Sequence, residues 1–491
     1  MKKQSFLYGA TVLAAASILC KIMSAALKIP LDRLFLHEEG IGVYQSAYSI
    51  YNVILAFCVT GIPIALSKII AESDEKEAPS LAKSTLLLVT SVTTILGVLL
   101  FTFAEPLARF LSGGGDAVAA PGLRVLAIAF PFMGIISSRR GYFQGKSLMT
   151  PSGISQLAES LTKVVLGIGI CATTYKMGTS YGVAGALSGV TIGAICAAMV
   201  LEIAFRRAET EKGKASYKNA IRVLKFSIPI TLGAFAFTAV MLLDTLSVPQ
   251  ILSHMGIGEK ERLELFGYLT RANTIYNLPA TVITAFTASA VPALVYASED
   301  KEKLGETASK VIKLIFLVAT PCALGMMLFP QELLLLVYSS KMHWELMVLV
   351  GGMVLIMPYI QTTTAMLQTL GKTWLPIWIS VGAVVLKLGL NVLFINLVGV
   401  EGAVLATVTA FLLTAIVNTL LLCKVAPVKS GFSTSAKLLI CAVASCGIAK
   451  VIYMFTGGTL MLLGCISLAA VLYLALVLKT KCFTIAEFKK G

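Results

Sequence analysis

Runs of roughly 20 apolar residues recur along the whole chain, and each is long enough to cross a lipid bilayer as a helix. Of the 491 residues 57% are hydrophobic and 13% are charged, so no stretch remains for a separate water-soluble domain. We therefore expect an all-α polytopic membrane protein with about fourteen transmembrane helices. The expected spans are residues 6–29, 45–69, 84–104, 122–139, 153–174, 182–204, 226–250, 272–297, 311–329, 346–369, 375–397, 402–423, 435–456 and 459–478.

The net charge of +15 raises the question of a nucleic-acid partner, but the cations sort by membrane side. With the amino terminus in the cytoplasm, about 27 Lys and Arg fall in cytoplasmic segments, about 10 outside and about three within spans, as the positive-inside rule requires. An even number of spans then places both termini in the cytoplasm. The distribution indicates a multi-pass protein of the cell membrane, in contact with membrane lipids and with no nucleic-acid partner.

The chain repeats itself with a period of about 220 residues. Ile50–Asn52 recurs as Ile275–Asn277, and Lys163 corresponds to Lys387. Because a repeat of six helices keeps its orientation, the two copies should form two lobes related by an axis along the membrane normal. The predicted parts are an N-terminal lobe over 1–222, a C-terminal lobe over 223–430, and two extra helices with a cytoplasmic tail over 431–491.

Three lysines lie deep inside predicted spans: Lys21, Lys163 and Lys387. An unpaired cation there costs several kcal/mol or more, so such side chains face a cavity and not lipid. Lys28 follows Lys21 by two helical turns and can present its ammonium group on the same helix face, or reach the membrane interface instead. A cationic interior of this kind favours a transporter of something anionic.

Two duplicated stretches are polar on one face. Arg271 opens the eighth span just before Asn273 and Asn277, and the matching region of the second span holds Gln45 and Asn52. A guanidinium group offers a planar fork suited to phosphate oxygens, and amides can satisfy sugar hydroxyls. The alternative is polar contact between helices.

Further charges within spans have more than one interpretation. Glu159 precedes Lys163 by four residues, which favours an ion pair along one helix, whereas Ala383 stands four residues before Lys387. Asp244 in the seventh span either pairs with a cation across the lobe interface or binds a coupling ion, Na⁺ or H⁺.

Sequence signals for catalysis are missing. Gly145–Ser147 is the one string that resembles a phosphate loop, but Arg140 stands where that loop requires a glycine. No histidine or cysteine has metal-ligand spacing, and no carboxylate pair has the setting that a membrane glycosyltransferase needs. We expect a protein that is not an enzyme, with no nucleotide, no metal and no cofactor.

The segment Arg140–Lys146, continuing to Glu159, resembles a signature of the polysaccharide flippases related to stage V sporulation protein B. The opening from Cys20 to Ala65 resembles the same family. Those flippases look like part of the multidrug, oligosaccharidyl-lipid and polysaccharide export superfamily and are similar to the lipid II flippases. The resemblance implies two six-helix lobes, alternating access and a place in the bacterial cytoplasmic membrane, with roles in cell-wall biogenesis or sporulation.

The resemblance also implies a lipid-linked sugar as the partner, most simply an undecaprenyl-pyrophosphate-linked peptidoglycan precursor. In that family, basic residues of the first and eighth spans are thought to meet the pyrophosphate, which by position points to Lys21, Lys28 and Arg271. Lysine stands at positions 28 and 163 where arginine is expected in relatives, so the bidentate fork is lost. Three alternatives stay open: export of capsule or teichoic-acid units, drug or cation antiport, and glycosyl transfer in the membrane.

Overall fold

The computed structural model describes residues 6–74, 76–208, 213–297, 300–370, 374–425 and 432–480. Every regular element within these ranges is a helix, so the all-α prediction is confirmed. The predicted cytoplasmic tail falls on residues 481–491, outside the described residues.

The predicted spans coincide with helices. Ten helices of the described part are long and apolar enough to cross a membrane. The other predicted spans fall on α1 (Phe6–Leu31), on the helical run from α2 (His37–Leu55) to α3 (Ile62–Glu72), on α9 (Tyr217–His254) and on α10 (Glu259–Ala297). These four include most of the predicted site.

The chain divides into two compact units. Unit 1 comprises Met1–Thr270 and Asn391–Val400, and unit 2 comprises Arg271–Leu390 and Glu401–Gly491. The boundary therefore falls inside α10. Unit 1 holds α9 and the first part of α10 in addition to the helices of the first sequence repeat. The division into lobes at residue 222 was based on the repeat and stays a prediction.

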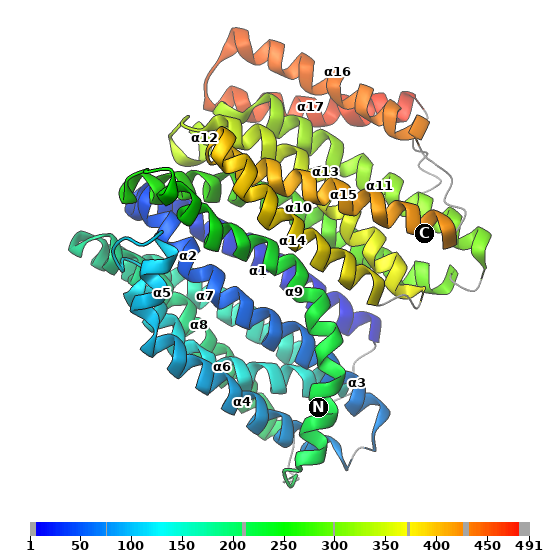
Figure 1. The fold of residues 1–491 in the computed structure, drawn as a ribbon. Coiled ribbons are helices and arrows are strands. Elements are labelled where there is room, and N and C mark those ends of the chain that lie inside the picture. Colours follow the sequence, from blue (N-terminus) through cyan, green and yellow to red (C-terminus); the bar gives the residue numbers. More distant parts are fainter. Residues whose placement is uncertain are drawn as a thin grey trace. The chain divides into compact units, whose positions relative to one another are not determined.

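Unit 1 packs α1 against α7 and α2. Its further elements are η1 (Asp32–Leu36), η2 (Ala56–Gly61), α4 (Ala78–Thr102), α5 (Ala104–Leu111), α6 (Ala120–Gly145), α7 (Met149–Thr174), η3 (Tyr175–Met177) and α8 (Thr179–Ala208). Helix α6 packs against α4 and α8, α8 lies along α7, and α7 lies along α1 (Figure 1). Because α1 also contacts α2, polar side chains of α1, α2 and α7 can meet.

Glycines allow α7 and α8 to approach closely. A Cβ built on Gly189 would lie 2.4 Å from the backbone nitrogen of Gly167, and one built on Gly193 would lie 2.7 Å from the carbonyl oxygen of Glu159. Larger side chains would force the two helices apart, as they do at tight helix interfaces in membranes. This packing fixes the rotation of α7 and therefore the directions of Glu159 and Lys163.

The loop after α5 is held against α9 and α10. The Nε and Nη2 atoms of Arg262 donate to the carbonyl oxygen of Ser112 at 3.2 and 3.1 Å, and the Glu259 Oε1 accepts from the backbone nitrogen of Asp116 at 2.6 Å. Gly113 adopts a φ of 79°, which favours glycine, and a Cβ there would lie 2.5 Å from a backbone oxygen. The glycine run of this loop is thus required for the turn.

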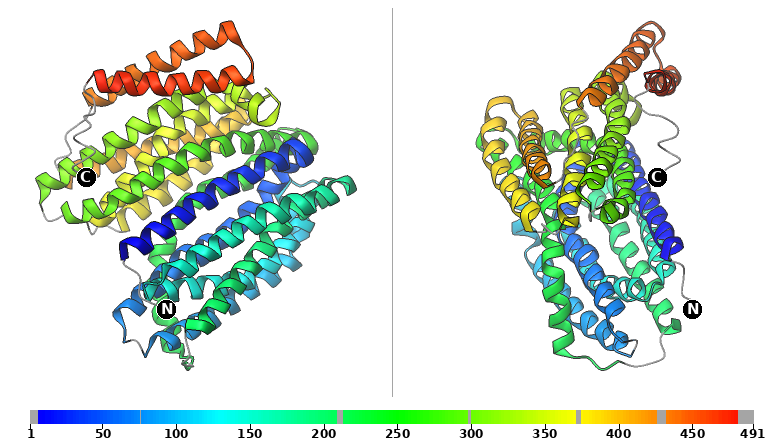
Figure 2. Two further views of the ribbon diagram at one scale, coloured as in Figure 1. Left: turned by 180° about the vertical axis from the view of Figure 1, so that it is seen from behind. Right: turned by 90° about the vertical axis from the view of Figure 1, so that its right-hand side faces the viewer.

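Unit 2 contains the rest of α10 together with α11 (Lys301–Leu328), α12 (Pro330–Tyr338), α13 (Trp344–Thr369), most of α14 (Trp374–Val398), α15 (Glu401–Val425), α16 (Phe432–Thr456) and α17 (Thr459–Lys479). Helices α16 and α17 run side by side, and α16 packs against α11 (Figure 2). Tyr473 donates to the carbonyl oxygen of Leu317 at 2.9 Å, and Lys450 Nζ lies 2.6 Å from Glu332 Oε1. The two helices that lack a repeat counterpart are therefore anchored to unit 2.

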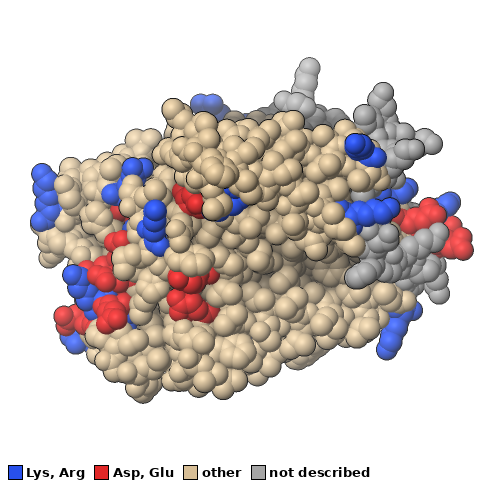
Figure 3. Space-filling model, turned by 90° about the horizontal axis from the view of Figure 1, so that it is seen from above, with Lys and Arg blue, Asp and Glu red and all other residues tan. Residues whose placement is uncertain are grey.

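Large apolar side chains are exposed on many helices, including Leu397, Ile440 and Val471, each more than 60% exposed. In Figure 3 a broad stretch of the visible face carries no charge, and Lys, Arg, Asp and Glu gather toward its left part and its right margin. An apolar surface of this extent is unfavourable in water and suits contact with acyl chains. The protein is thus a multi-pass membrane protein.

Candidate functional site

Helix α1 carries the two lysines that we predicted to meet a phosphate group. Lys21 is exposed, and Lys28 is half-buried two turns further along. The Lys28 Nζ donates to the Gln45 Oε1 on α2 at 2.7 Å. Gln45 is one of the residues predicted to line a polar cavity, so the structure joins two predicted site residues.

The hydrogen-bonded chain continues from Gln45 into α9. Gln45 Nε2 donates to Ser49 Oγ at 3.0 Å, and Ser49 Oγ lies 2.9 Å from Thr245 Oγ1. Ser49 and Thr245 are both buried. Neither was predicted from the sequence, because serine and threonine in helices usually bond to their own backbone and give no signal of a site.

Lys163 on α7 points toward α1. Its Nζ donates to Ser24 Oγ at 2.7 Å and lies 5.8 Å from the centre of the Tyr48 ring, and the residue is 9% exposed. The predicted ion pair between Glu159 and Lys163 is wrong. Ser24 was not among the predicted site residues.

Glu159 pairs instead with an arginine of α6. Arg140 Nη2 lies 2.9 Å from Glu159 Oε2, and Arg140 Nε donates to Ser155 Oγ at 3.1 Å. Arg140 is 3% exposed, so its charge requires this carboxylate. The guanidinium group reaches Glu159 from a neighbouring helix and leaves Lys163 to a neutral partner.

Arg139, which precedes Arg140 on α6, also lies beside a carboxylate. Arg139 Nε lies 2.9 Å from Glu202 Oε2 on α8, and the guanidinium carbon lies 3.5 Å from the centre of the Phe205 ring. Arg206 Nε lies 3.3 Å from the other oxygen of Glu202. These contacts tie α6 to α8 and give Arg139 a structural role.

Asp244 on α9 meets the end of α14. The Asn391 Nδ2 donates to Asp244 Oδ1 at 3.1 Å and to Ser247 Oγ at 2.8 Å. Asn391 is fully buried, and among the described residues its Oδ1 has no hydrogen-bond partner. An unsatisfied buried carbonyl beside a carboxylate is a set of oxygen ligands suited to a cation. Asn391 was not among the predicted site residues.

The remaining predicted residues lie on several helices. Asn52 is half-buried on α2 in unit 1. In unit 2, Arg271 is 3% exposed and its guanidinium carbon lies 5.1 Å from the centre of the Tyr338 ring on α12. On α10, Asn273 is half-buried and Asn277 is exposed, and Lys387 on α14 is fully buried. That Lys21, Lys28 and Arg271 share one cavity stays a prediction.

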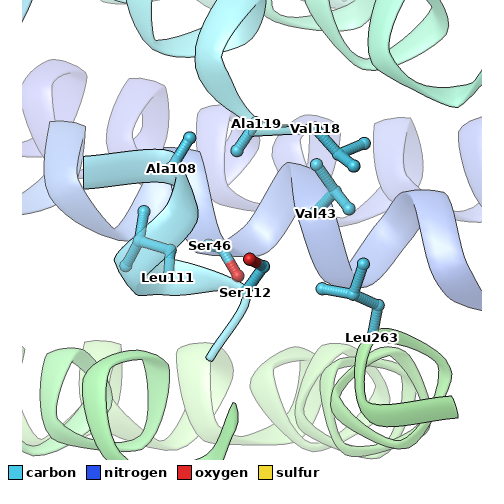
Figure 4. A pocket seen from close by; sticks show the side chains of 8 residues that line it. All are labelled: Val43, Ser46, Ala108, Leu111, Ser112, Val118, Ala119 and Leu263. Carbon is cyan, nitrogen blue, oxygen red and sulfur yellow. The ribbon is translucent and has the colours of Figure 1, made fainter. Parts of the chain in front are cut away.

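One pocket of unit 1 lies beneath the loop that follows α5. Its lining residues are Val43, Ser46, Ala108, Leu111, Ser112, Val118, Ala119 and Leu263 (Figure 4). The cavity measures about 10 Å³, roughly the space of one water molecule. It is too small for a sugar or a phosphate group, so it is not the substrate site.

The fold is shared with solved membrane transporters. A structure titled "Lipid II flippase MurJ, inward closed conformation" matches with a TM-score of 0.73 at 14% identity, over 95% of this chain and 98% of that chain. An inward-facing multidrug resistance MATE family transporter of the MOP superfamily matches with a TM-score of 0.68 at 19% identity, over 82% and 93% of the two chains. The chain therefore has the fold of this class of transporters and flippases.

The sequence identifies the family within that class. Residues 6–298, more than half of the chain, match the family described as "Polysaccharide biosynthesis protein". The chain belongs to this family.

Three proteins of Bacillus subtilis (strain 168) are similar over most of their length. Stage V sporulation protein B is 25% identical over 97% of this chain and 96% of its own, and the lipid II flippase MurJ is 22% identical over 83% and 80%. The uncharacterized membrane protein YabM is 27% identical over 85% and 80%. The resemblance inferred from the motifs is confirmed.

Proposed function

We propose that the protein is a flippase that moves an undecaprenyl-pyrophosphate-linked saccharide, a peptidoglycan precursor of the lipid II type, from the inner to the outer leaflet of the bacterial cytoplasmic membrane. The observation that carries this proposal is the setting of Lys28. Its ammonium group lies within a membrane helix and bonds to a neutral amide oxygen, 2.7 Å away. A cation placed so, in a chain of the polysaccharide biosynthesis protein family, suits a phosphate-bearing substrate.

In this proposal the charged headgroup crosses through the protein and the polyprenyl tail stays in lipid. Lys21 and Lys28 on α1 and Arg271 on α10 offset the burial of the pyrophosphate. Amide side chains hydrogen-bond to sugar hydroxyls. The residues assigned to that task are Gln45, Asn52, Asn273 and Asn277. Rocking of the two lobes of the repeat then gives alternating access.

Because the sequence has no nucleotide-binding motif, the driving force in this proposal is the membrane potential or an ion gradient. Asp244 and the unsatisfied Oδ1 of Asn391 are the oxygen ligands assigned to a coupling cation, Na⁺ or H⁺. Substrate consumption on the outer side would add to the driving force. Lys387, fully buried on α14, is assigned no task in transport.

Reconstitution tests the proposal directly. We expect purified protein in liposomes to carry a fluorescent undecaprenyl-pyrophosphate saccharide between leaflets, and Lys28→Ala to stop this transfer. Transfer by the variant at the native rate would remove the phosphate role of Lys28. In cells, depletion should cause a lipid-linked intermediate to accumulate on the cytoplasmic leaflet, and its chemical analysis identifies the sugar.

Two other substrates have support from the comparisons. The family description covers polysaccharides in general, so teichoic-acid or capsule units that accumulate on depletion would redirect the assignment. The MATE-like fold allows drug or cation antiport, although that activity needs an acidic interior and α1 contributes lysines. A flippase returns its substrate chemically unchanged, which also separates it from a glycosyltransferase.

A further inference from the structure

Lys28 and Lys163, here called the lysine pair, converge from α1 and α7. Lys163 bonds to Ser24, which precedes Lys28 by one turn of α1, so the two ammonium groups approach the same side of that helix. The two charges repel each other electrostatically. The lysine pair is therefore a local concentration of positive charge inside unit 1.

The partners of the lysine pair are neutral. Lys28 donates to an amide oxygen and Lys163 to a hydroxyl oxygen, each at 2.7 Å. Within the described ranges, no carboxylate oxygen lies within 4.0 Å of either ammonium nitrogen. Like charges held together inside a protein without a counter-charge are unfavourable unless an anion joins them.

The surrounding side chains suit an anion with several oxygens. Ser24, Gln45 and Tyr48 each carry a polar group able to donate a hydrogen bond, and each lies beside one of the two lysines. An ammonium group donates three hydrogen bonds, and one neutral oxygen takes up one of them. Both lysines thus retain donors for phosphate oxygens.

Glu159 is near enough in sequence to neutralise Lys163, but it pairs with another residue. Its carboxylate stands four residues before Lys163 on α7, within reach for an ion pair along the helix. It lies instead 2.9 Å from Arg140. Arg140 thereby pairs with the carboxylate that would otherwise neutralise Lys163.

We infer that the lysine pair forms a phosphate-binding site and that Lys163 is a further substrate-binding residue. The inference rests on the proposed function for the kind of ligand, and it adds a residue of α7 to a site so far assigned to α1 and α10. A phosphate group bridges the two ammonium groups, and Ser24 and Gln45 orient them. The shared chemistry is a phosphate or pyrophosphate, free or at the head of a lipid.

Binding to the purified full-length protein in nanodiscs tests the inference. The probes are undecaprenyl pyrophosphate, inorganic pyrophosphate and undecaprenol, which has the tail without the phosphates. We expect Lys163→Met to weaken undecaprenyl pyrophosphate binding about tenfold, and Lys163→Arg to restore most of it, because the charge returns. Undecaprenol binding should be the same in all variants.

A matched control separates a local effect from a general loss of positive charge. Lys176→Met removes an exposed lysine on η3, just beyond the end of α7, and should leave binding of all three probes unchanged. If Lys163→Met does not fold, Lys163→Gln keeps a hydrogen bond to Ser24 and still removes the charge. Native affinity for undecaprenyl pyrophosphate in a folded, uncharged variant would overturn the inference.

The inorganic pyrophosphate arm identifies the source of the phosphate. Binding of this probe that depends on Lys163 supports a site for free anions, whereas dependence seen only with undecaprenyl pyrophosphate supports a lipid headgroup. If the protein binds undecaprenyl pyrophosphate through Lys163 but does not transfer a lipid-linked saccharide, the inferred site stands and the proposed function is wrong. If the protein transfers the saccharide but binding does not depend on Lys163, the proposed function stands and the inferred site is wrong.

Discussion

Unit 1 holds two groups of basic side chains, buried or half-buried, whose neighbours differ in charge. Arg139 and Arg140 on α6, here called the arginine pair, each lie 2.9 Å from a carboxylate oxygen. Lys28 and Lys163 have an amide oxygen and a serine hydroxyl at 2.7 Å. The arginine pair is neutralised by the protein itself, and the lysine pair is not.

The difference separates structure from ligand binding. A buried cation that is neutralised by a carboxylate from another helix holds the two helices together and has little left to offer a ligand. A cation with a neutral partner keeps its charge available, at the expense of stability in the free protein. The arginine pair therefore has a structural role, because it links α6 to α7 and α8. The lysine pair, by contrast, is a candidate ligand-binding site.

Breaking the arginine pair should give the largest effect on stability. Arg140→Met leaves the Glu159 carboxylate without its partner, and we expect the free energy of unfolding to fall by about 3 kcal/mol. The measurement is unfolding in mixed detergent micelles followed by circular dichroism. The double variant Arg140→Met with Glu159→Gln should recover most of the loss, because no unpaired charge remains. If Arg140→Met alone were as stable as the native protein, the structural role of the arginine pair would be contradicted.

Lys28 should give the next effect, on transport. We expect Lys28→Met to lower the rate of transfer of an undecaprenyl-pyrophosphate saccharide about a hundredfold, since charge-assisted hydrogen bonds to the phosphates are lost. Transfer between leaflets in liposomes measures it, with Lys176→Met as the control that keeps the native rate. A hundredfold loss accompanied by unfolding of Lys28→Met would place Lys28 with the arginine pair instead.

Lys163 should show the opposite sign from Arg140. Lys163→Met removes one of two like charges and loses a hydrogen bond to a serine hydroxyl. Because relief of the repulsion outweighs that loss, we expect the ligand-free protein to gain about 1 kcal/mol in unfolding free energy. The same micelle titration measures this. A loss of stability as large as that of Arg140→Met would mean that Lys163 is structural and would remove the contrast between the two pairs.

Hydropathy predicted the helices well because a bilayer allows few other structures, yet several helices extend beyond the predicted spans. The fourth span was predicted to end at residue 139, and α6 continues to Gly145. The two arginines lowered the hydropathy of the window, but in the structure both are buried and neutralised. Charges that are satisfied by other helices do not end a helix, and a sequence window has no access to those partners.

Only part of the candidate site was predicted, again because the sequence does not show which side chains meet across different helices. Depth within a span singled out Lys21 and Lys163, and the duplicated polar stretch singled out Gln45, which does bond to Lys28. The partner of Glu159 was missed because the rule for residues four apart considers one helix. Arg140 precedes Glu159 by 19 residues on another helix, and only the packing of α6 against α7 brings the two together.

Phe205 should give the smallest effect and test whether the arginine pair depends on its carboxylates alone. The guanidinium carbon of Arg139 lies 3.5 Å from the centre of this ring, an arrangement that adds a cation–π contribution to the Glu202 contact. We expect Phe205→Leu, which keeps an apolar side chain, to lower the free energy of unfolding by about 0.5 kcal/mol. The double variant Phe205→Leu with Arg139→Met isolates that contribution in a thermodynamic cycle. A coupling energy near zero would assign the stabilisation of Arg139 to Glu202, and a coupling larger than that of the carboxylate would reverse the order of the two partners.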